Sequence, residues 1–174
     1  MTRDRLAALL AAALVPGAAG ALERRTDHRD THGPWIEAAL AHDTVTPAGE
    51  DASGRWRPAL RVAWGLDVSG EGDELSLGVQ GSPGSDPDGS HVRLALDARY
   101  RGYFGIDAWK TFFDVGIWAP VSSFVSVGPL VGLGVAWDPS RAAGVYLAGT
   151  FATAFGEARV ATFTIGLGAQ LRFE

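Results

Sequence analysis

The last fourteen residues of the chain alternate between apolar side chains and small or polar ones. From Ala161 to Glu174 the sequence reads ATFTIGLGAQLRFE. Because successive side chains of a β-strand point to opposite faces, this stretch predicts a strand with one apolar face and one face of Thr, Gly, Gln and Arg. The solvent side of a soluble strand is polar, but it is rarely built on glycine. We therefore expect the small and polar face to line a cramped interior and the apolar face to be the exterior, as in a transmembrane β-strand.

The N-terminus has the three parts of a secretory signal peptide. A charged start, Met1–Arg5, precedes the apolar run Leu6–Val15, and small residues follow up to Ala21. The apolar run is much shorter than the roughly 20 residues of a spanning helix. We predict a cleaved signal peptide at residues 1–21 and an exposed, charged, periplasmic N-terminal tail at residues 22–34.

Composition narrows the classes of partner and ligand. The chain has no cysteine and a net charge of −5, which excludes disulfides and lipoprotein anchoring and argues against nucleic acid as a partner. His28 and His32 are four residues apart in the tail, but two histidines alone leave a zinc site short of ligands. We expect no metal and no cofactor.

Eight runs with a period of two follow, and nearly all break at Gly, Pro or Asp-rich turns. Their lengths are close to the roughly 9–11 residues with which a tilted strand crosses hydrocarbon. The connections on one side, such as 70–73 and 138–141, are short turns; on the other side 46–55 and 81–90 are longer and more polar, and 120–123 and 156–157 are brief. The sequence therefore predicts an all-β fold, an eight-stranded antiparallel up-and-down transmembrane β-barrel over residues 35–174, with both termini on the side of the short turns. The predicted strands are 35–45, 56–68, 74–80, 91–103, 108–119, 124–137, 142–155 and 158–174.

Aromatic residues gather near both ends of these predicted strands. Two aromatic girdles are typical of a barrel whose rims lie at the two headgroup interfaces. A soluble lipocalin-type barrel also alternates, but it points its apolar face inward and would leave a Gly- and Ala-rich exterior here. Phe112 and Trp118 break the pattern of their own run, and Trp35 is expected at the turn side. The predicted girdles contain Trp56, Tyr100, Trp109, Trp118, Trp137 and Phe155.

The signal peptide, the eight alternating runs and the aromatic residue near the C-terminus resemble the small outer-membrane barrels of the OmpA/OmpX type, from about Trp35 onward. Glu174 departs from the pattern, because it follows the aromatic residue that normally ends such chains. The resemblance implies a monomer in the cell outer membrane, surrounded by outer-membrane lipid and lipopolysaccharide and inserted by the outer-membrane assembly machinery. The residues that resemble the signature read by that machinery are Ile165, Leu167, Ala169, Leu171 and Phe173.

The interior of an eight-stranded barrel is about wide enough for side chains to fill it. Charges that are removed from water must be paired. We expect Arg61, Arg93, Asp97 and Asp114 to form a central cluster. Glu37 should meet Arg172 near the periplasmic end, because the first and last strands must be neighbours. This lumenal network is expected to be a structural plug rather than a gated path.

Three functions remain open at this point. The favoured one is a structural or surface-interaction barrel without catalysis. The second is a narrow conduit for small or apolar solutes. The third is a lipid-modifying enzyme at the outer rim, for which the candidate residues are His42, Asp43, Ser85, Ser90 and His91. A nucleophile and its base must lie within hydrogen-bond reach, and nothing in this spacing enforces that, so no catalytic residue is predicted.

Overall fold

A computed structural model describes residues 31–47, 53–68, 72–84, 92–105, 108–122, 125–140 and 142–173. The predicted signal peptide, most of the predicted tail and Glu174 lie outside these ranges. Within them, no helix has the length and apolar character needed to cross a membrane.

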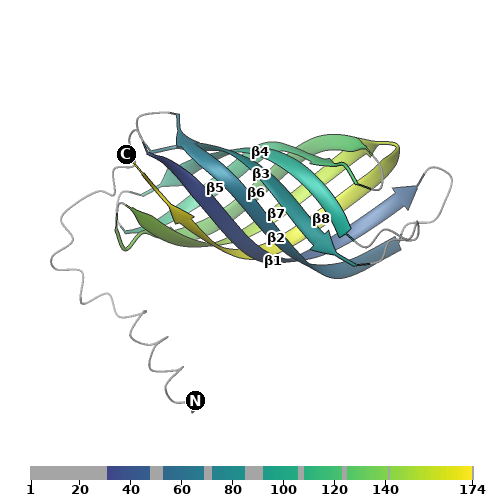
Figure 1. The fold of residues 1–174 in the computed structure, drawn as a ribbon, viewed down its shortest axis with the longest axis horizontal. Coiled ribbons are helices and arrows are strands. Elements are labelled where there is room, and N and C mark those ends of the chain that lie inside the picture. Colours follow the sequence, from purple (N-terminus) through teal and green to yellow (C-terminus); the bar gives the residue numbers. More distant parts are fainter. Residues whose placement is uncertain are drawn as a thin grey trace, which may run out of the picture.

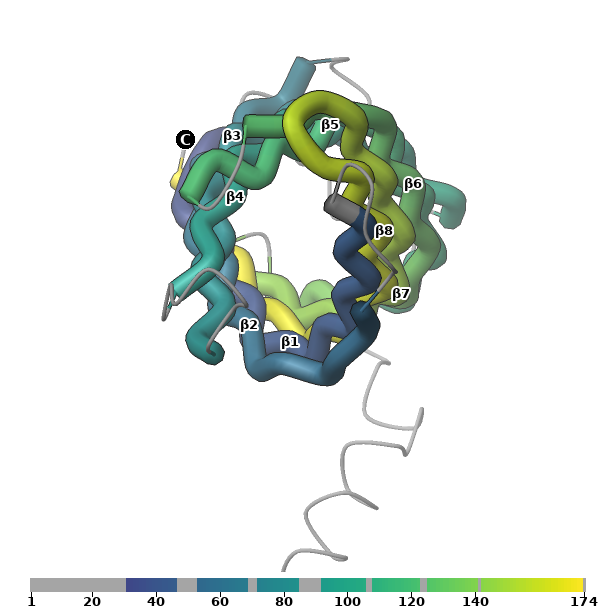
Figure 2. The backbone as a smooth tube through the Cα atoms, turned by 90° about the vertical axis from the view of Figure 1, so that its right-hand side faces the viewer, coloured from purple at the N-terminus to yellow at the C-terminus, as the bar shows by residue number. Residues whose placement is uncertain are grey.

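The strands form a single closed ring in which each strand is antiparallel to the next (Figure 1). β1 pairs with β8 and so closes the ring, which Figure 2 shows in a view along the barrel. The predicted fold class is confirmed. The strands are β1 (His32–Pro47), β2 (Ser53–Asp67), β3 (Glu74–Pro83), β4 (Val92–Phe104), β5 (Trp109–Pro120), β6 (Ser126–Trp137), β7 (Ala143–Gly156) and β8 (Ala158–Leu171).

The first strand of the barrel begins three residues earlier in the chain than the sequence predicts. β1 begins at His32, so residues 32–34, which were assigned to the tail, belong to the barrel. The backbone N–H of His32 donates to the carbonyl of Phe173 at 2.9 Å, and the N–H of Phe173 donates back at 2.7 Å. The N–H of Asp67 also donates to the carbonyl of Thr31, at 2.9 Å. The start of the chain's first strand is therefore held from both sides.

The apolar faces of the strands form the outside of the barrel. The exposed fractions of Leu133, Leu167 and Leu77 are 71%, 64% and 63%, whereas Thr164, Gln170 and Arg172 are buried. This is the inverse of a soluble protein, in which exposed large hydrophobic side chains do not form a continuous surface. The lipocalin-type alternative would need Leu133 and Leu167 inside, so it is excluded.

The interior wall is divided into a half with large side chains and a half with small ones. Long charged side chains come mostly from β1 to β5, and the inner faces of β6, β7 and β8 carry mainly Gly, Ala, Ser and Thr. A Cβ on Gly134 would lie 2.2 Å from the Phe112 ring, and one on Gly168 would lie 2.1 Å from the Tyr146 ring. The small residues therefore provide the space into which the large side chains reach.

Two tryptophans that were predicted at the girdles lie inside the barrel. Trp118 is 2% exposed and Trp35 is 1% exposed. Trp118 has the same strand parity as Asp114 and Phe112, so it points inward, where it packs near Leu130 and the small residues of β7 and β8. The pattern of β5 is thus unbroken, and its apparent irregularity comes from aromatic side chains on an inner face. Of the other predicted girdle residues, Trp56, Trp109 and Phe155 are more than half exposed, and Tyr100 and Trp137 are intermediate.

We expect Gly134→Ala to destabilise the barrel by about 1–3 kcal/mol, because overpacking forces rings and backbone apart. The added Cβ would also lie 2.4 Å from the carbonyl oxygen of Leu147, which cannot rotate away. Gly149→Ala is the matched control, since no atom lies within 4 Å of its Cβ position. The measurement is the urea unfolding midpoint of barrels folded in lipid vesicles. Equal midpoints for the two variants would contradict the packing role of Gly134.

Candidate functional site

The charged interior is the candidate functional site. The described residues contribute seven buried cations and six buried carboxylates, so the two signs nearly balance. These side chains form separate groups from the loop end of the barrel to the turn end. The cations are Arg57, Arg61, Arg93, Arg99, Arg101, Lys110 and Arg172, and the carboxylates are Glu37, Asp43, Glu74, Asp97, Asp114 and Asp138.

At the loop end, Asp43 lies between two arginines. Nη1 of Arg93 is 2.7 Å from Oδ2 of Asp43, and Nε of Arg57 is 3.8 Å from the same oxygen. Arg57 also donates to the carbonyl of Gly84 at 3.1 Å. An apolar cluster packs at the same end of the interior, and its members are Val45, Ala95, Trp118, Leu130, Ala152, Ala154, Ala158 and Val160. This end is therefore filled by both ion pairs and apolar side chains.

In the middle, one carboxylate accepts from two guanidinium groups. Arg61 donates to both oxygens of Asp97, through Nη2 at 2.6 Å and Nε at 2.9 Å. Nε of Arg99 donates to Oδ1 of Asp97 at 2.8 Å. Arg61 also donates to Ser76 at 3.0 Å. Such bidentate, charge-assisted bonds hold the guanidinium in one orientation.

Arg101 is packed against three aromatic rings. Its Cζ lies 3.8 Å from the ring centroid of Phe112, 4.4 Å from that of Tyr146 and 4.5 Å from that of Trp35. Its Nε and Nη2 donate to the two oxygens of Asp114 at 2.7 and 2.9 Å. A buried cation is attracted to aromatic faces, and here one partner carboxylate supplies the compensating charge. The side chain is completely buried.

At the turn end, Glu74 and Asp138 gather donors from several strands. Glu74 accepts from the hydroxyl of Tyr103 at 2.6 Å, from Nε2 of Gln170 at 2.7 Å and from Nε of Arg172 at 3.3 Å. Asp138 accepts from Nη1 of Arg172 at 3.0 Å and lies 3.1 Å from Nζ of Lys110. Arg172 therefore joins the two carboxylates into one network.

The predicted central cluster divides into three separate groups. Arg61 and Asp97 do pair, but Arg93 pairs with Asp43 and Asp114 pairs with Arg101. Arg93 is four residues from Asp97 along β4, which is about 13 Å at strand rise. Asp114 lies directly opposite Arg101 in the β4–β5 register. Only Arg101 and Asp114 lie on paired strands, because the other two pairs join strands that are not adjacent, β2 with β4 and β4 with β1.

The predicted contact between Glu37 and Arg172 is wrong. Register places Glu37 opposite Gly168, whereas Arg172 lies beyond the last pair, Trp35 with Gln170. Glu37 instead accepts from the hydroxyl of Tyr146 at 2.9 Å. A Cβ on Gly166 would lie 2.5 Å from Oε1 of Glu37, so this carboxylate reaches over the bare inner face of β8.

Sequence reasoning missed several members of these groups. Asp43 and Glu74 could have been found by parity, since they lie an even number of residues from Glu37 and Ser76 on strands that were assigned. Asp138 also continues the inward parity of Gly134 and Ala136, but it follows the end of β6, in a stretch that the sequence predicts to be a turn.

The rim residues considered for catalysis do not share a face. His42 packs against Trp56 with ring centroids 4.9 Å apart, whereas the adjacent Asp43 points into the interior. Ser85, Ser90 and His91 lie outside the described residues. Among the residues that are described, no group of three or more His, Cys, Asp or Glu side chains is placed to hold a metal ion.

Comparisons with known proteins identify the fold. No family model matches the chain, and no curated protein matches it in sequence. Among solved structures, the chain is similar to Neisserial surface protein A, with a TM-score of 0.62, 10% identity, and coverage of 80% of this chain and 97% of that one. The N-terminal β-barrel domain of Pseudomonas aeruginosa OprF gives a TM-score of 0.59, 11% identity, and coverage of 83% and 98%. The outer membrane protein OprG from the same organism gives 0.58, 12%, and coverage of 86% and 99%. The fold is that of small eight-stranded outer-membrane barrels.

We expect Asp114→Asn to destabilise the barrel by about 3–5 kcal/mol, because it leaves the charge of Arg101 buried without a carboxylate. The double variant Arg101→Met/Asp114→Asn removes both charges and should recover most of this loss. Urea unfolding of the single and double variants in lipid vesicles gives the coupling free energy. If the double variant were no more stable than Asp114→Asn, the unpaired charge of Arg101 would not be the cause of the destabilisation.

Proposed function

We propose that the protein is an integral outer-membrane barrel that remains a closed, side-chain-filled cylinder and has a structural or surface-interaction role without catalysis. The observation that carries this proposal is the position of Arg101, which is packed among three rings and held by Asp114. An ion or solute moving along the barrel would have to displace this fully buried group.

Two further layers support a closed interior. The apolar cluster around Trp118 and Leu130 fills the loop end, and the network of Glu74, Asp138 and Arg172 fills the turn end. One layer lies on the loop side of Arg101 and the other on its turn side, so a solute would have to pass all three. Opening a path would require simultaneous loss of several ion pairs, which favours a plug over the narrow conduit.

The exterior supports a location in lipid. A continuous apolar surface needs hydrocarbon around it, and a closed ring leaves no unpaired strand edge. In this proposal the barrel is a monomer that contacts outer-membrane lipid and lipopolysaccharide. The outward residues Ile165, Leu167, Ala169, Leu171 and Phe173 serve as its assembly signal. The termini and the connections β2–β3, β4–β5 and β6–β7 face the periplasm, and the other four connections face outward.

Single-channel recording in planar bilayers tests the closed interior. We expect the folded wild-type barrel to produce no conductance steps. The variant Arg101→Ala/Phe112→Ala/Tyr146→Ala removes the middle of the filling and should raise the frequency of small steps. A shift in gel migration on heating shows whether each sample is folded. Regular conductance steps from the folded wild type would support the conduit and contradict the closed interior.

Cysteine labelling tests the orientation, because the chain has no cysteine of its own. We expect Asp51→Cys, in the connection between β1 and β2, to react with a membrane-impermeant maleimide on intact cells. Glu71→Cys, between β2 and β3, should react only after the outer membrane is permeabilised. The reverse pattern would place the termini on the cell surface.

A further inference from the structure

Gly149 differs from the other glycines of the eight strands. A Cβ placed on each of the others meets at least one atom within 4 Å, but a Cβ on Gly149 meets none. Glycine weakens the interior of a strand, so its presence normally reflects a bulge or a close approach. No contact within the barrel requires a glycine at this position.

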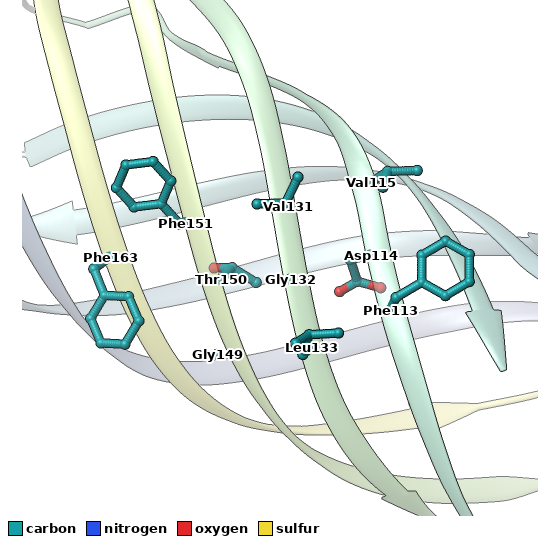
Figure 3. Close-up of a pocket in the computed structure, with 10 residues that line it drawn as sticks. All are labelled: Phe113, Asp114, Val115, Val131, Gly132, Leu133, Gly149, Thr150, Phe151 and Phe163. Carbon is teal, nitrogen blue, oxygen red and sulfur yellow. The ribbon is translucent and has the colours of Figure 1, made fainter. Parts of the chain in front are cut away.

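Gly149 forms part of the floor of a recess on the outside of the barrel. It pairs with Leu133 on β6 and Ile165 on β8, and both side chains are exposed. The recess has a volume of about 610 Å³, and Figure 3 shows the residues around it. A second hollow of about 380 Å³ shares Leu133 and Gly149 and continues past Val135 and Leu147. The outward side chains of the first recess are Phe113, Val115, Val131, Leu133, Phe151 and Phe163.

The position of the recess limits what can occupy it. Gly149 lies near the middle of β7, within the apolar exterior, where the surroundings in a bilayer are hydrocarbon. The two hollows together form one open apolar groove, to whose floor Gly149 contributes no side chain. A linear acyl chain fits such a groove. A second copy of the barrel would have to cover a far larger area, since stable interfaces bury about 1,200–2,000 Å².

A cation lies at the loop end of the same wall. The outward positions of β8 lead from Ile165 through Phe163 and Ala161 to Arg159, which is exposed. Arg159 is opposite Thr46 of β1 in the register, and none of the described side chains hydrogen-bonds or ion-pairs with it. Six residues span about 20 Å along a strand and about 14 Å of depth at a tilt of about 45°. This is half of a hydrocarbon core of about 30 Å, so Arg159 reaches the headgroups when Gly149 is at the midplane.

We propose that this wall binds one phosphorylated lipid of the leaflet at the loop ends, with an acyl chain in the groove at Gly149 and the phosphate at Arg159. The inference rests on the proposed function, because it requires the barrel to lie in a bilayer. It adds a defined lipid site to a surface that is otherwise uniformly apolar. The phosphate and the acyl chain are recognised by different residues, so each of the two contacts can be removed by its own substitution.

Electron spin resonance with lipids labelled near the end of one acyl chain tests both parts. The probes are spin-labelled phosphatidylglycerol and phosphatidylcholine in phosphatidylcholine vesicles that contain the barrel. For the wild type we expect motionally restricted lipid whose preference for phosphatidylglycerol fits one site of about fivefold selectivity among unselective sites on the rest of the barrel, equivalent to about 1 kcal/mol for one arginine at the surface. Arg159→Gln should abolish the preference. Gly149→Leu should reduce the restricted fraction for both lipids.

Gly81→Leu is the matched control for Gly149→Leu. Gly81 is a half-buried strand glycine of β3 whose Cβ position has only Leu94 nearby, at 3.8 Å, and we expect its substitution to leave the spectra unchanged. Spectra of Gly149→Leu that match those of the wild type would overturn the inference. A change in oligomeric state on that substitution would also overturn it, because it would indicate that a second copy of the barrel occupies the groove. A barrel that inserts into vesicles without lipid preference would refute the lipid site alone. Failure to insert would also refute the proposed function.

Discussion

Closure of the backbone ladder between β1 and β8 is the constraint on which the rest of the structure depends. In hydrocarbon an unpaired amide has no water to bond, so a sheet can lie there only when its first and last strands meet. The pairing runs from Pro47 opposite Ala158 to Trp35 opposite Gln170, and the reciprocal bonds of His32 and Phe173 extend it. Once the ring is closed, strand parity assigns every side chain either to the outside or to a narrow interior. The apolar exterior and the charged interior are two consequences of this one closure.

The interior then has to satisfy two conditions, volume and charge. Long side chains from β1 to β5 cannot fit unless the inner faces of β6, β7 and β8 are nearly bare, and glycines such as Gly134 beside Phe112 and Gly166 beside Glu37 provide that space. The same close packing removes water, so each guanidinium has to find a carboxylate nearby, as Arg101 finds Asp114 across the β4–β5 pair. Packing and pairing therefore depend on each other. This explains why the charged groups are distributed along the barrel rather than gathered at one level.

The sequence was sufficient for the strands and for the inside and outside of the wall, because both follow from a period of two. It was insufficient for the ion pairs. Glu37 and Arg172 have the correct parity, yet the stagger of β1 against β8 separates them, and stagger leaves no mark in the alternation. Trp118 was misplaced for another reason. An aromatic residue near a strand end resembles a girdle residue, but the parity of Trp118 turns it inward, where the small residues of β7 and β8 leave room for it.

The strand glycines show most clearly what the sequence alone could not predict. Gly134 and Gly149 are both strand glycines in alternating runs, and parity assigns them to opposite faces without showing what each one contacts. The first faces inward and leaves room for the ring of Phe112, whereas the second faces outward into open space. An inward glycine is explained by the barrel itself. An outward glycine between Leu133 and Ile165 gives up apolar surface where the membrane would favour it, so its explanation has to come from what lies outside the barrel. The lipid-facing wall is therefore a surface that can carry specificity, even though nearly all of its side chains are of one kind.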